Sequence, residues 1–246
     1  DYGPYGWLDN YDPDWTPNTT DAQQRRYRFG NQPTVAHWNL VQLAQAIAPL
    51  LGDVKPLQDA LDHYVEHFHE CWARFMSRKL GLEDEGGEAQ RSLLEQLPGL
   101  LTVVETDMTL FFRQLARVEA DPDLGETELL APLMEAYYED ISENSQYRQQ
   151  AADWIRSLIQ IWNKGSFSDS DRVALMNRNN PQYVLRNYLA QLAIDEAEAG
   201  EYGSLHELQS VLETPYDTQT GKDHVAAKRP DWARHRAGCS MLSCSS

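Results

Sequence analysis

Residues 56–80 read PLQDALDHYVEHFHECWARFMSRKL, and this stretch decides the fold class of the chain. Its apolar side chains recur every three or four residues, the spacing that places them on one face of a helix. They are Leu57, Leu61, Tyr64, Val65, Phe68, Trp72, Phe75 and Met76. Pro56 suits a first helical turn, and Gly81 follows the other end. The stretch therefore predicts one long helix.

The same spacing extends on both sides of this helix. Before it, apolar residues from Thr34 to Leu51 predict a helix that stops at Gly52. After it, helical segments are predicted at 88–97, 101–119, 126–142, 146–162, 169–178, 181–200 and 204–212. No stretch alternates apolar and polar residues convincingly, so no sheet is predicted. The predicted fold class is all-α, with about eight helices.

Two different segments flank the helical region. Residues 1–34 combine glycine and proline with seven aromatic side chains, so they cannot form a long helix but can pack as an ordered loop. Long ordered loops usually have a function. Residues 214–246 are polar and irregular and carry a pair of cysteines. The predicted organisation is a loop at 1–34, a helical domain at 35–213 and an extended tail at 214–246.

Composition limits the possible functions. The chain has 246 residues and a net charge of −17, which argues against a large nucleic-acid surface, because such a surface needs a basic face. No apolar run approaches the roughly 18–20 residues of a membrane span, and no secretory leader is visible. Three cysteines do not make a disulfide scaffold. We expect a cytoplasmic protein that binds neither nucleic acid nor membrane.

Asp1-Tyr2-Gly3 is the first candidate site. Asp-aromatic-Gly is the pattern with which kinase folds hold Mg²⁺ against nucleotide phosphates. The carboxylate is a suitable Mg²⁺ ligand, and glycine lets the backbone turn sharply behind it. The same three residues can also form an ordinary turn. Asp1 is thus a candidate metal and nucleotide ligand.

The long helix carries a histidine cluster. His63 and His67 are four residues apart, as zinc ligands can be, but no glutamate stands where a zinc protease needs one. Glu66 and Glu70 are expected to pair with neighbouring histidines on a solvated face. We expect no specific zinc site here, and a buried, inert thiol at Cys71.

Two further features are candidates. Cys239 and Cys244 could close a small disulfide loop, bind metal, act as exposed redox thiols, or be incidental in a frayed end, and we expect both to be accessible. Asn180 and Pro181 are expected to start a helix as N-cap and first-turn residue. Arg186, early in that helix, is expected to pin a neighbouring segment.

Short motifs stand in a fixed order along the chain. They are Asp1-Tyr2-Gly3-Pro4-Tyr5-Gly6, Phe29-Gly30-Asn31-Gln32-Pro33, His37-Trp38-Asn39-Leu40, Asn180-Pro181 with Tyr183-Val184-Leu185-Arg186-Asn187, Pro215-Tyr216-Asp217, Arg229-Pro230-Asp231-Trp232 and Ser243-Cys244-Ser245-Ser246. Each is modest, but together they span nearly the whole chain and resemble the selenoprotein O family of protein adenylyltransferases.

The resemblance implies a kinase-like fold that transfers AMP from ATP to serine, threonine or tyrosine hydroxyls of proteins, with Mg²⁺ or Mn²⁺. Asp1 would ligate the metal and so the nucleotide, and residues 2–34 would be the activation segment near the protein substrate. The small lobe and catalytic loop would precede Asp1. We therefore expect the large-lobe part of a monomeric enzyme, with no catalytic residue of its own and no activity alone.

The resemblance also concerns the cysteines. In some members of the family the position of Cys244 is selenocysteine, and a cysteine near position 17 can pair with it. This chain, of the bacterial type, has Cys244 and Pro17 at these positions. The implied redox residues are therefore Cys244 and Cys239.

Two other functions remain open. The same fold could phosphorylate proteins as an ordinary kinase, or the helices could form an interaction module without catalysis. Labelled ATP distinguishes them: α-phosphate label on protein indicates AMP transfer, γ-phosphate label indicates a kinase, and neither label favours the interaction module.

Overall fold

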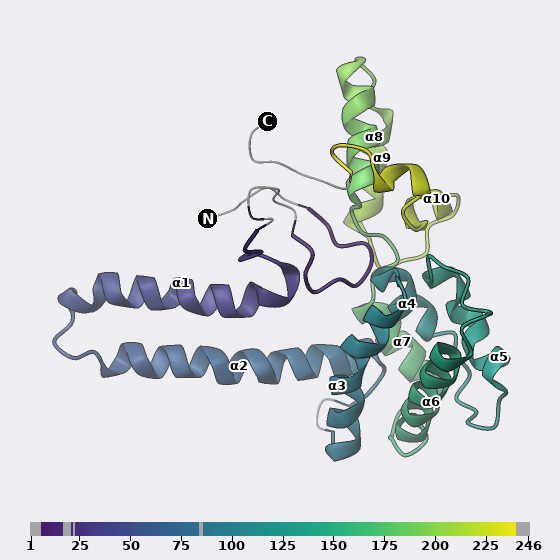
Figure 1. Cartoon of the computed structure of the whole chain (residues 1–246), viewed down its shortest axis with the longest axis horizontal. Helices are drawn as coiled ribbons and strands as arrows, with labels where there is room; N and C mark the ends of the chain where they lie inside the picture. The colour runs from purple at the N-terminus through teal and green to yellow at the C-terminus, as the bar shows by residue number, and fades with distance from the viewer. Residues whose placement is uncertain (1–5, 17–20, 22, 84–85, 240–246) are drawn as a thin grey trace.

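The structure is a computed structural model of the chain and describes residues 6–16, 21, 23–83 and 86–239. In these residues the fold is all-helical, with isolated bridges in place of strands, as predicted (Figure 1). The helices are α1 (Gln32–Ile47), α2 (Lys55–Lys79), α3 (Glu88–Val103), α4 (Met108–Leu115), α5 (Glu126–Leu130), α6 (Ser145–Trp162), α7 (Asp169–Asn179), α8 (Asn187–Glu198), α9 (Gly203–Glu213) and α10 (Asp223–Ala226). Short 3-10 turns are η2 (Phe29–Asn31), η3 (Ala48–Leu50), η4 (Ala131–Ala136) and η5 (Asp231–Arg234).

Helices α1 and α2 form a hairpin that projects from the rest of the molecule (Figure 1). The long helix predicted at 56–80 is confirmed, and α2 ends where Gly81 takes a left-handed φ of 69°. Glycine suits this position because a Cβ there would lie 2.7 Å from Cγ of Arg172. The Leu82 amide then donates to the Ser77 carbonyl at 2.9 Å, which closes the end of the helix.

The main core is built from the apolar faces of α3, α4, α5 and α6, together with the end of α2 and part of α7. Two indoles of α6 fasten this core because their ring nitrogens donate to buried carbonyls of other segments. Trp154 donates to Leu93 at 3.1 Å, and Trp162 donates to Leu80 at 2.8 Å. Buried indole nitrogens need such partners, so α6 is held against both α3 and the end of α2.

A second, smaller core joins α8 and α9 to the last part of the chain. Its buried members are Tyr183, Tyr188, Leu189, Ala193, Leu208, Val211, Val225, Ala233 and Cys239. The predicted irregular tail is therefore only partly right. Residues 223–239 contribute a short helix, a 3-10 turn and three core side chains to this cluster.

Several predicted helix boundaries are wrong. The break expected after residue 97 is absent, because α3 continues through Pro98 to Val103. The break lies instead at 104–107, where Asp107 caps α4 by accepting from the Leu110 amide at 2.9 Å. The helix expected at 126–142 is split into α5 and η4.

The helix predicted from Pro181 is also wrong, because α8 begins only at Asn187. Asn180 follows α7 and does not cap a new helix; its side chain donates to the Lys79 carbonyl at 2.8 Å. The amides of Gln182 and Tyr183 donate to the Pro215 carbonyl at 2.8 and 3.1 Å. The Pro215 carbonyl thus accepts from the amides that a side-chain cap by Asn180 would have bonded.

Across the described ranges, no helix combines the length and apolar character required to cross a membrane.

Candidate functional site

The predicted site residues are only partly described. Asp1, the predicted metal and nucleotide ligand, and Cys244, a predicted redox residue, lie outside the described residues. Their roles stay predictions. Cys239 and Arg186 are described, and Arg186 leads to the most developed polar cluster in the chain.

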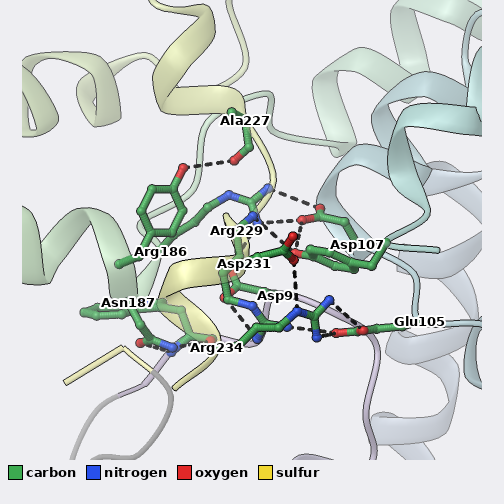
Figure 2. Close-up of polar contacts among 12 residues, drawn as sticks. Asp9, Glu105, Asp107, Arg186, Asn187, Ala227, Arg229, Asp231 and Arg234 are labelled. Carbon is green, nitrogen blue, oxygen red and sulfur yellow. Dashed lines mark hydrogen bonds and ion pairs between the residues drawn. The ribbon is translucent and has the colours of Figure 1, made fainter. Parts of the chain in front are cut away.

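Arg186 lies at the centre of a buried ionic network (Figure 2). Its Nη1 donates to Oδ2 of Asp107 at 2.6 Å and to Oδ1 of Asp9 at 3.0 Å, and its Nη2 donates to Oδ1 of Asp107 at 3.1 Å. All three side chains are almost completely removed from solvent. The prediction that Arg186 pins a neighbouring segment is confirmed, and the segment is the one that contains Asp9.

The network continues through Glu105 to the last part of the chain. Arg229 and Arg234 each donate to Oε1 of Glu105, at 2.8 and 2.9 Å. Arg229 also lies 3.9 Å from Asp9. Together with Arg186, these arginines place three guanidinium groups against the three carboxylates of Asp9, Glu105 and Asp107, and Arg234 also lies 3.4 Å from the exposed Asp231. Pairing with an opposite charge offsets the free-energy cost of burying each group.

Tyr138 lies between the two halves of the network. Its hydroxyl donates to Oδ2 of Asp107 at 3.1 Å and accepts from the Arg229 amide at 3.3 Å. The guanidinium carbons of Arg229 and Arg234 lie 5.2 and 5.1 Å from its ring centroid, within the range of a cation–π contact. Burial, followed by the charges of Asp107 and Asp9, raises the pKa of Tyr138. The phenol is therefore kept as a neutral donor.

Backbone bonds explain why the carboxylates meet. Residues 105–108 lie between two other extended stretches, 9–11 and 136–138. On one side, the Tyr11 amide donates to Thr106 at 2.9 Å and the Met108 amide donates to Asp9 at 3.0 Å. On the other side, the Asp107 amide donates to the Ala136 carbonyl at 2.7 Å, and the Tyr138 amide donates to the Glu105 carbonyl at 3.0 Å. Asp9, Glu105 and Asp107 are thus brought together by main-chain bonds as well as by their ion pairs.

Asn187, the first residue of α8, holds the same N-terminal segment by its side chain. Its Oδ1 accepts from the Trp7 amide at 3.0 Å, and its Nδ2 donates to the Trp7 carbonyl at 2.9 Å. This reciprocal pair mimics a strand contact. Arg186 and Asn187 together attach residues 7–9 to the start of α8.

The charges of the two aspartates in the network are not equally compensated by Arg186. Burial alone would lower the pKa of Arg186, but the charges of Asp107 and Asp9 outweigh burial and raise it. For Asp9, burial dominates over the attraction of Arg186 and raises the pKa above its ordinary value of 3.8. Asp107 takes two of the three Arg186 contacts. Asp9 is therefore the carboxylate whose charge is least well compensated.

This shift predicts a pH-dependent effect of replacing Asp9 with asparagine. Above pH 3.8 and below its raised native pKa, Asp9 keeps a proton in the folded chain that it releases in the unfolded chain, so its contribution to stability decreases as pH rises. The stability of the wild type relative to Asp9→Asn should therefore be greater at pH 4 than at pH 7. Urea unfolding of both proteins at the two pH values measures this difference. A difference that grows with pH would contradict the assignment.

The arrangement anchors the segment around Asp9. Each carboxylate is taken up by guanidinium groups, which leaves no free oxygen set for a cation. Within the described part of the chain, no group of three or more His, Cys, Asp or Glu side chains could hold a metal ion. Asp9, Glu105 and Asp107 thus do not fit an Mg²⁺ site.

Sequence reasoning missed four members of the network: Asp9, Glu105, Asp107 and Arg234. One local signal was available. Glu105 and Asp107 are the charged residues in an otherwise uncharged, mostly apolar stretch that begins at Leu100 and ends at Phe112, and acidic residues buried in such a stretch need partners. That signal indicates a buried pair, but it does not identify the arginines.

The histidine cluster agrees with its predicted surface position. The rings of His63 and His67 stack with centroids 5.4 Å apart. Nδ1 of His67 lies 4.0 Å from Glu70, which confirms the expected pairing with a glutamate on an exposed face. The expectation that this cluster binds no zinc stays a prediction, to be checked by metal analysis of purified protein.

The predicted exposure of the cysteines is wrong for both thiols that are described. Cys239 is only 2% exposed and belongs to the second core. Gly238, with φ of 80°, turns the chain so that Cys239 packs there, and a Cβ at this glycine would overlap Gln191. Cys71, expected to be buried, is partly exposed, because its stretch of α2 lies on the projecting hairpin.

We accordingly expect Cys71 to alkylate faster than Cys239 in the native protein. Burial raises the pKa of Cys239, which lowers its thiolate fraction as well as its access to reagent. Cys71 lies 3.4 Å from both His67 Nε2 and Arg74 Nη2 on the surface of α2. Timed alkylation followed by peptide mass spectrometry measures both rates. Faster labelling of Cys239 would show that the tail leaves the second core in solution.

Comparison with known proteins adds independent information. The sequence matches the family described as "Protein adenylyltransferase SelO" over residues 1–213. It is 50% identical over 258 residues to a protein of Rhodopirellula baltica, 49% identical over 246 residues to one of Aromatoleum aromaticum, and 50% identical over 246 residues to one of Xanthomonas campestris pv. campestris. Each is named "Protein nucleotidyltransferase YdiU".

These matches differ in how much of each protein they cover. All of this chain is aligned, but only 47% of the Rhodopirellula protein and 46% of each of the other two. The chain thus spans about half the length of the curated relatives it matches. Since the family match covers most of the chain and carries the motifs at 1–6, 29–40 and 180–187, the chain belongs to the SelO family.

Proposed function

We propose that the full-length protein, of which residues 1–246 form one part, transfers AMP from ATP to serine, threonine or tyrosine hydroxyls of proteins. The observation that carries this proposal is the family match over residues 1–213, which includes Asp1-Tyr2-Gly3. The names of the relatives support it, because proteins that are 50% and 49% identical to this chain are named protein nucleotidyltransferases. The proposed setting is a monomer in the cytoplasm with a large lobe of kinase-like fold.

Residues 2–34 are proposed to be the activation segment beside the protein substrate. The buried network supports this proposal, because it fixes Asp9 and its neighbours to α8 and to the stretch before α4. A segment that presents a substrate or a ligand is best held by a rigid support of this kind. Asp1 lies eight residues before Asp9, so it is tethered within about 26–29 Å of the anchor.

Asp1 is proposed to hold Mg²⁺ or Mn²⁺, and through it the ATP phosphates. When bound, such a metal neutralises charge on the phosphates and orients them. The contribution of this chain would be one carboxylate and the anchored segment behind it. The proposed redox role of Cys239 and Cys244 requires the tail to leave the second core, since Cys239 is buried there.

The test uses the full-length protein with ATP labelled on either the α- or the γ-phosphate. Transfer of the α label to protein substrates, without the γ label, is the expected result. Transfer of the γ label would show a protein kinase instead. If neither label reaches protein under conditions where the full-length protein is folded, the proposed function is wrong.

A further inference from the structure

Helix α1 has no charged residue, as is usual for a buried helix, but much of its surface is exposed. Between Arg28 and Asp53 the sequence contains no Asp, Glu, Lys or Arg, although 24% of the chain is charged. A helix that faces solvent normally carries charged residues on its outer side, whereas one without them is usually buried on all sides. Among the described helices, α2 is the one that lies along α1 (Figure 1).

One side of α1 has a partner. The half-buried residues His37, Val41, Ala44 and Ala48 recur at helical spacing on this side. The His37 ring stacks on Tyr64 of α2 with centroids 5.7 Å apart, and the Tyr64 hydroxyl donates to the Pro33 carbonyl at 3.2 Å. Helix α2 therefore covers this side of α1.

A second apolar stripe, which runs from α1 into η3, is exposed in the described part of the chain. We call it the outer stripe; it consists of Ala36, Leu40, Leu43, Ile47 and Leu50. The spacings of four, three, four and three residues place these side chains on one face. Its four large members are 37%, 56%, 36% and 82% exposed, in chain order. A continuous apolar row of this kind on a soluble surface marks a contact site.

The size of the stripe indicates what covers it. Helix α1 is about 24 Å long, and five side chains offer only part of the roughly 1,200–2,000 Å² that a stable interface between separate proteins buries. A surface of this size is better suited to a partner in the same polypeptide, where linkage gives a high effective concentration. The curated relatives have such a partner available, because over half of each lies outside the region that aligns with this chain.

We propose that the outer stripe of α1 is the packing surface for an apolar face in the part of the full-length protein outside residues 1–246. The inference rests on the uncovered stripe and the length of the relatives, and it does not depend on which nucleotide reaction the protein performs. Helix α1 would then lie in an internal interface of the full-length protein. The hairpin would project only when residues 1–246 stand alone.

Cysteine accessibility tests this proposal. Leu43→Cys is introduced into both the full-length protein and residues 1–246, and alkylation at each cysteine is followed by peptide mass spectrometry. The thiol at position 43 should react at least about tenfold more slowly in the full-length protein. The matched control is Glu66→Cys on α2, an exposed charged position that should react equally in both proteins. Equal rates at position 43 in both proteins would overturn the proposal.

Two further measurements separate other outcomes. If protection of position 43 in the full-length protein appears only as protein concentration is raised, a second copy covers the stripe and the proposal is wrong. Leu43→Glu provides a second readout: it should lower the urea midpoint of the full-length protein and leave that of residues 1–246 nearly unchanged. A similar small effect in both would contradict an internal interface, even if the cysteine variant failed to fold.

Discussion

Replacing Arg186 with alanine should destabilise the chain by about 3–5 kcal/mol, the range seen when one partner of a buried ion pair is removed. The substitution leaves Asp107 and Asp9 buried without their shared guanidinium, and it removes contacts at 2.6, 3.0 and 3.1 Å. It also removes one of the two side chains that attach residues 7–9 to the start of α8, and leaves the Asn187 pair with Trp7 in place. Urea unfolding followed by circular dichroism measures the loss.

Arg148→Ala is the matched control. Arg148 also makes an arginine–carboxylate pair, with Glu126 at 2.7 Å, but both side chains are partly exposed. Exposed pairs contribute about 0–1 kcal/mol, so this variant should lose little stability. If the Arg186 variant does not fold at all, Arg186→Met combined with Asp9→Asn should recover part of the stability, because one uncompensated charge is gone. Equal small losses at Arg186 and Arg148 would show that the network is not a structural anchor.

The elements that could be predicted from sequence are those determined by residues within the element or next to it. Helix α2 was located to within one residue at each end, because Pro56, the apolar spacing and Gly81 all act within the helix or beside it. The all-α class follows from the same kind of signal. Where a local signal competes with a distant contact, the prediction is wrong. At Pro181, the carbonyl of Pro215 takes the amides of residues 182 and 183, and the helix starts six residues later.

The anchor itself could be predicted only in part. Arg186 was identified as a residue early in a predicted helix that pins a neighbouring segment, but its partners lie 177 and 79 residues away in sequence. No spacing rule connects positions that far apart. The cysteines show the same limit. Cys239 looks like part of a polar tail in sequence, and it becomes a core residue only because Gly238 turns it onto α8.

Helix α1 shows a different limit. Its apolar spacing predicts a helix correctly, but α1 carries two apolar stripes and spacing cannot say which stripe has a partner. In residues 1–246 one stripe packs on α2 and the other is exposed. On the packing proposed above, the exposed stripe finds its partner in the full-length protein.

Replacing Asp1 with alanine in the full-length protein should lower the rate of AMP transfer by about 10²–10³-fold, the scale seen when one preorganised electrostatic element of a catalytic site is removed. The substitution removes the carboxylate proposed to hold Mg²⁺ or Mn²⁺, and the positive charge of that metal is what offsets the phosphates. Residues 1–246 alone should transfer no AMP, because Mg²⁺ bound to one carboxylate also relies on substrate phosphates held by other groups. The measurement is transfer of α-labelled AMP to protein, with circular dichroism to confirm folding.

Asp14→Ala is the control in the same segment. Asp14 is an exposed carboxylate that pairs with Arg28 at 3.2 Å, so its loss removes a similar charge without removing the proposed ligand. This variant should keep near-full activity, whereas Asp1→Ala should not. Three results have distinct meanings. A wild-type protein that transfers no α label contradicts the proposed reaction. An active wild type with an equally active, folded Asp1→Ala variant shows that Asp1-Tyr2-Gly3 is an ordinary turn. Equal losses at Asp1 and Asp14 would show that the segment needs its negative charge in general, and that Asp1 has no specific role as a ligand.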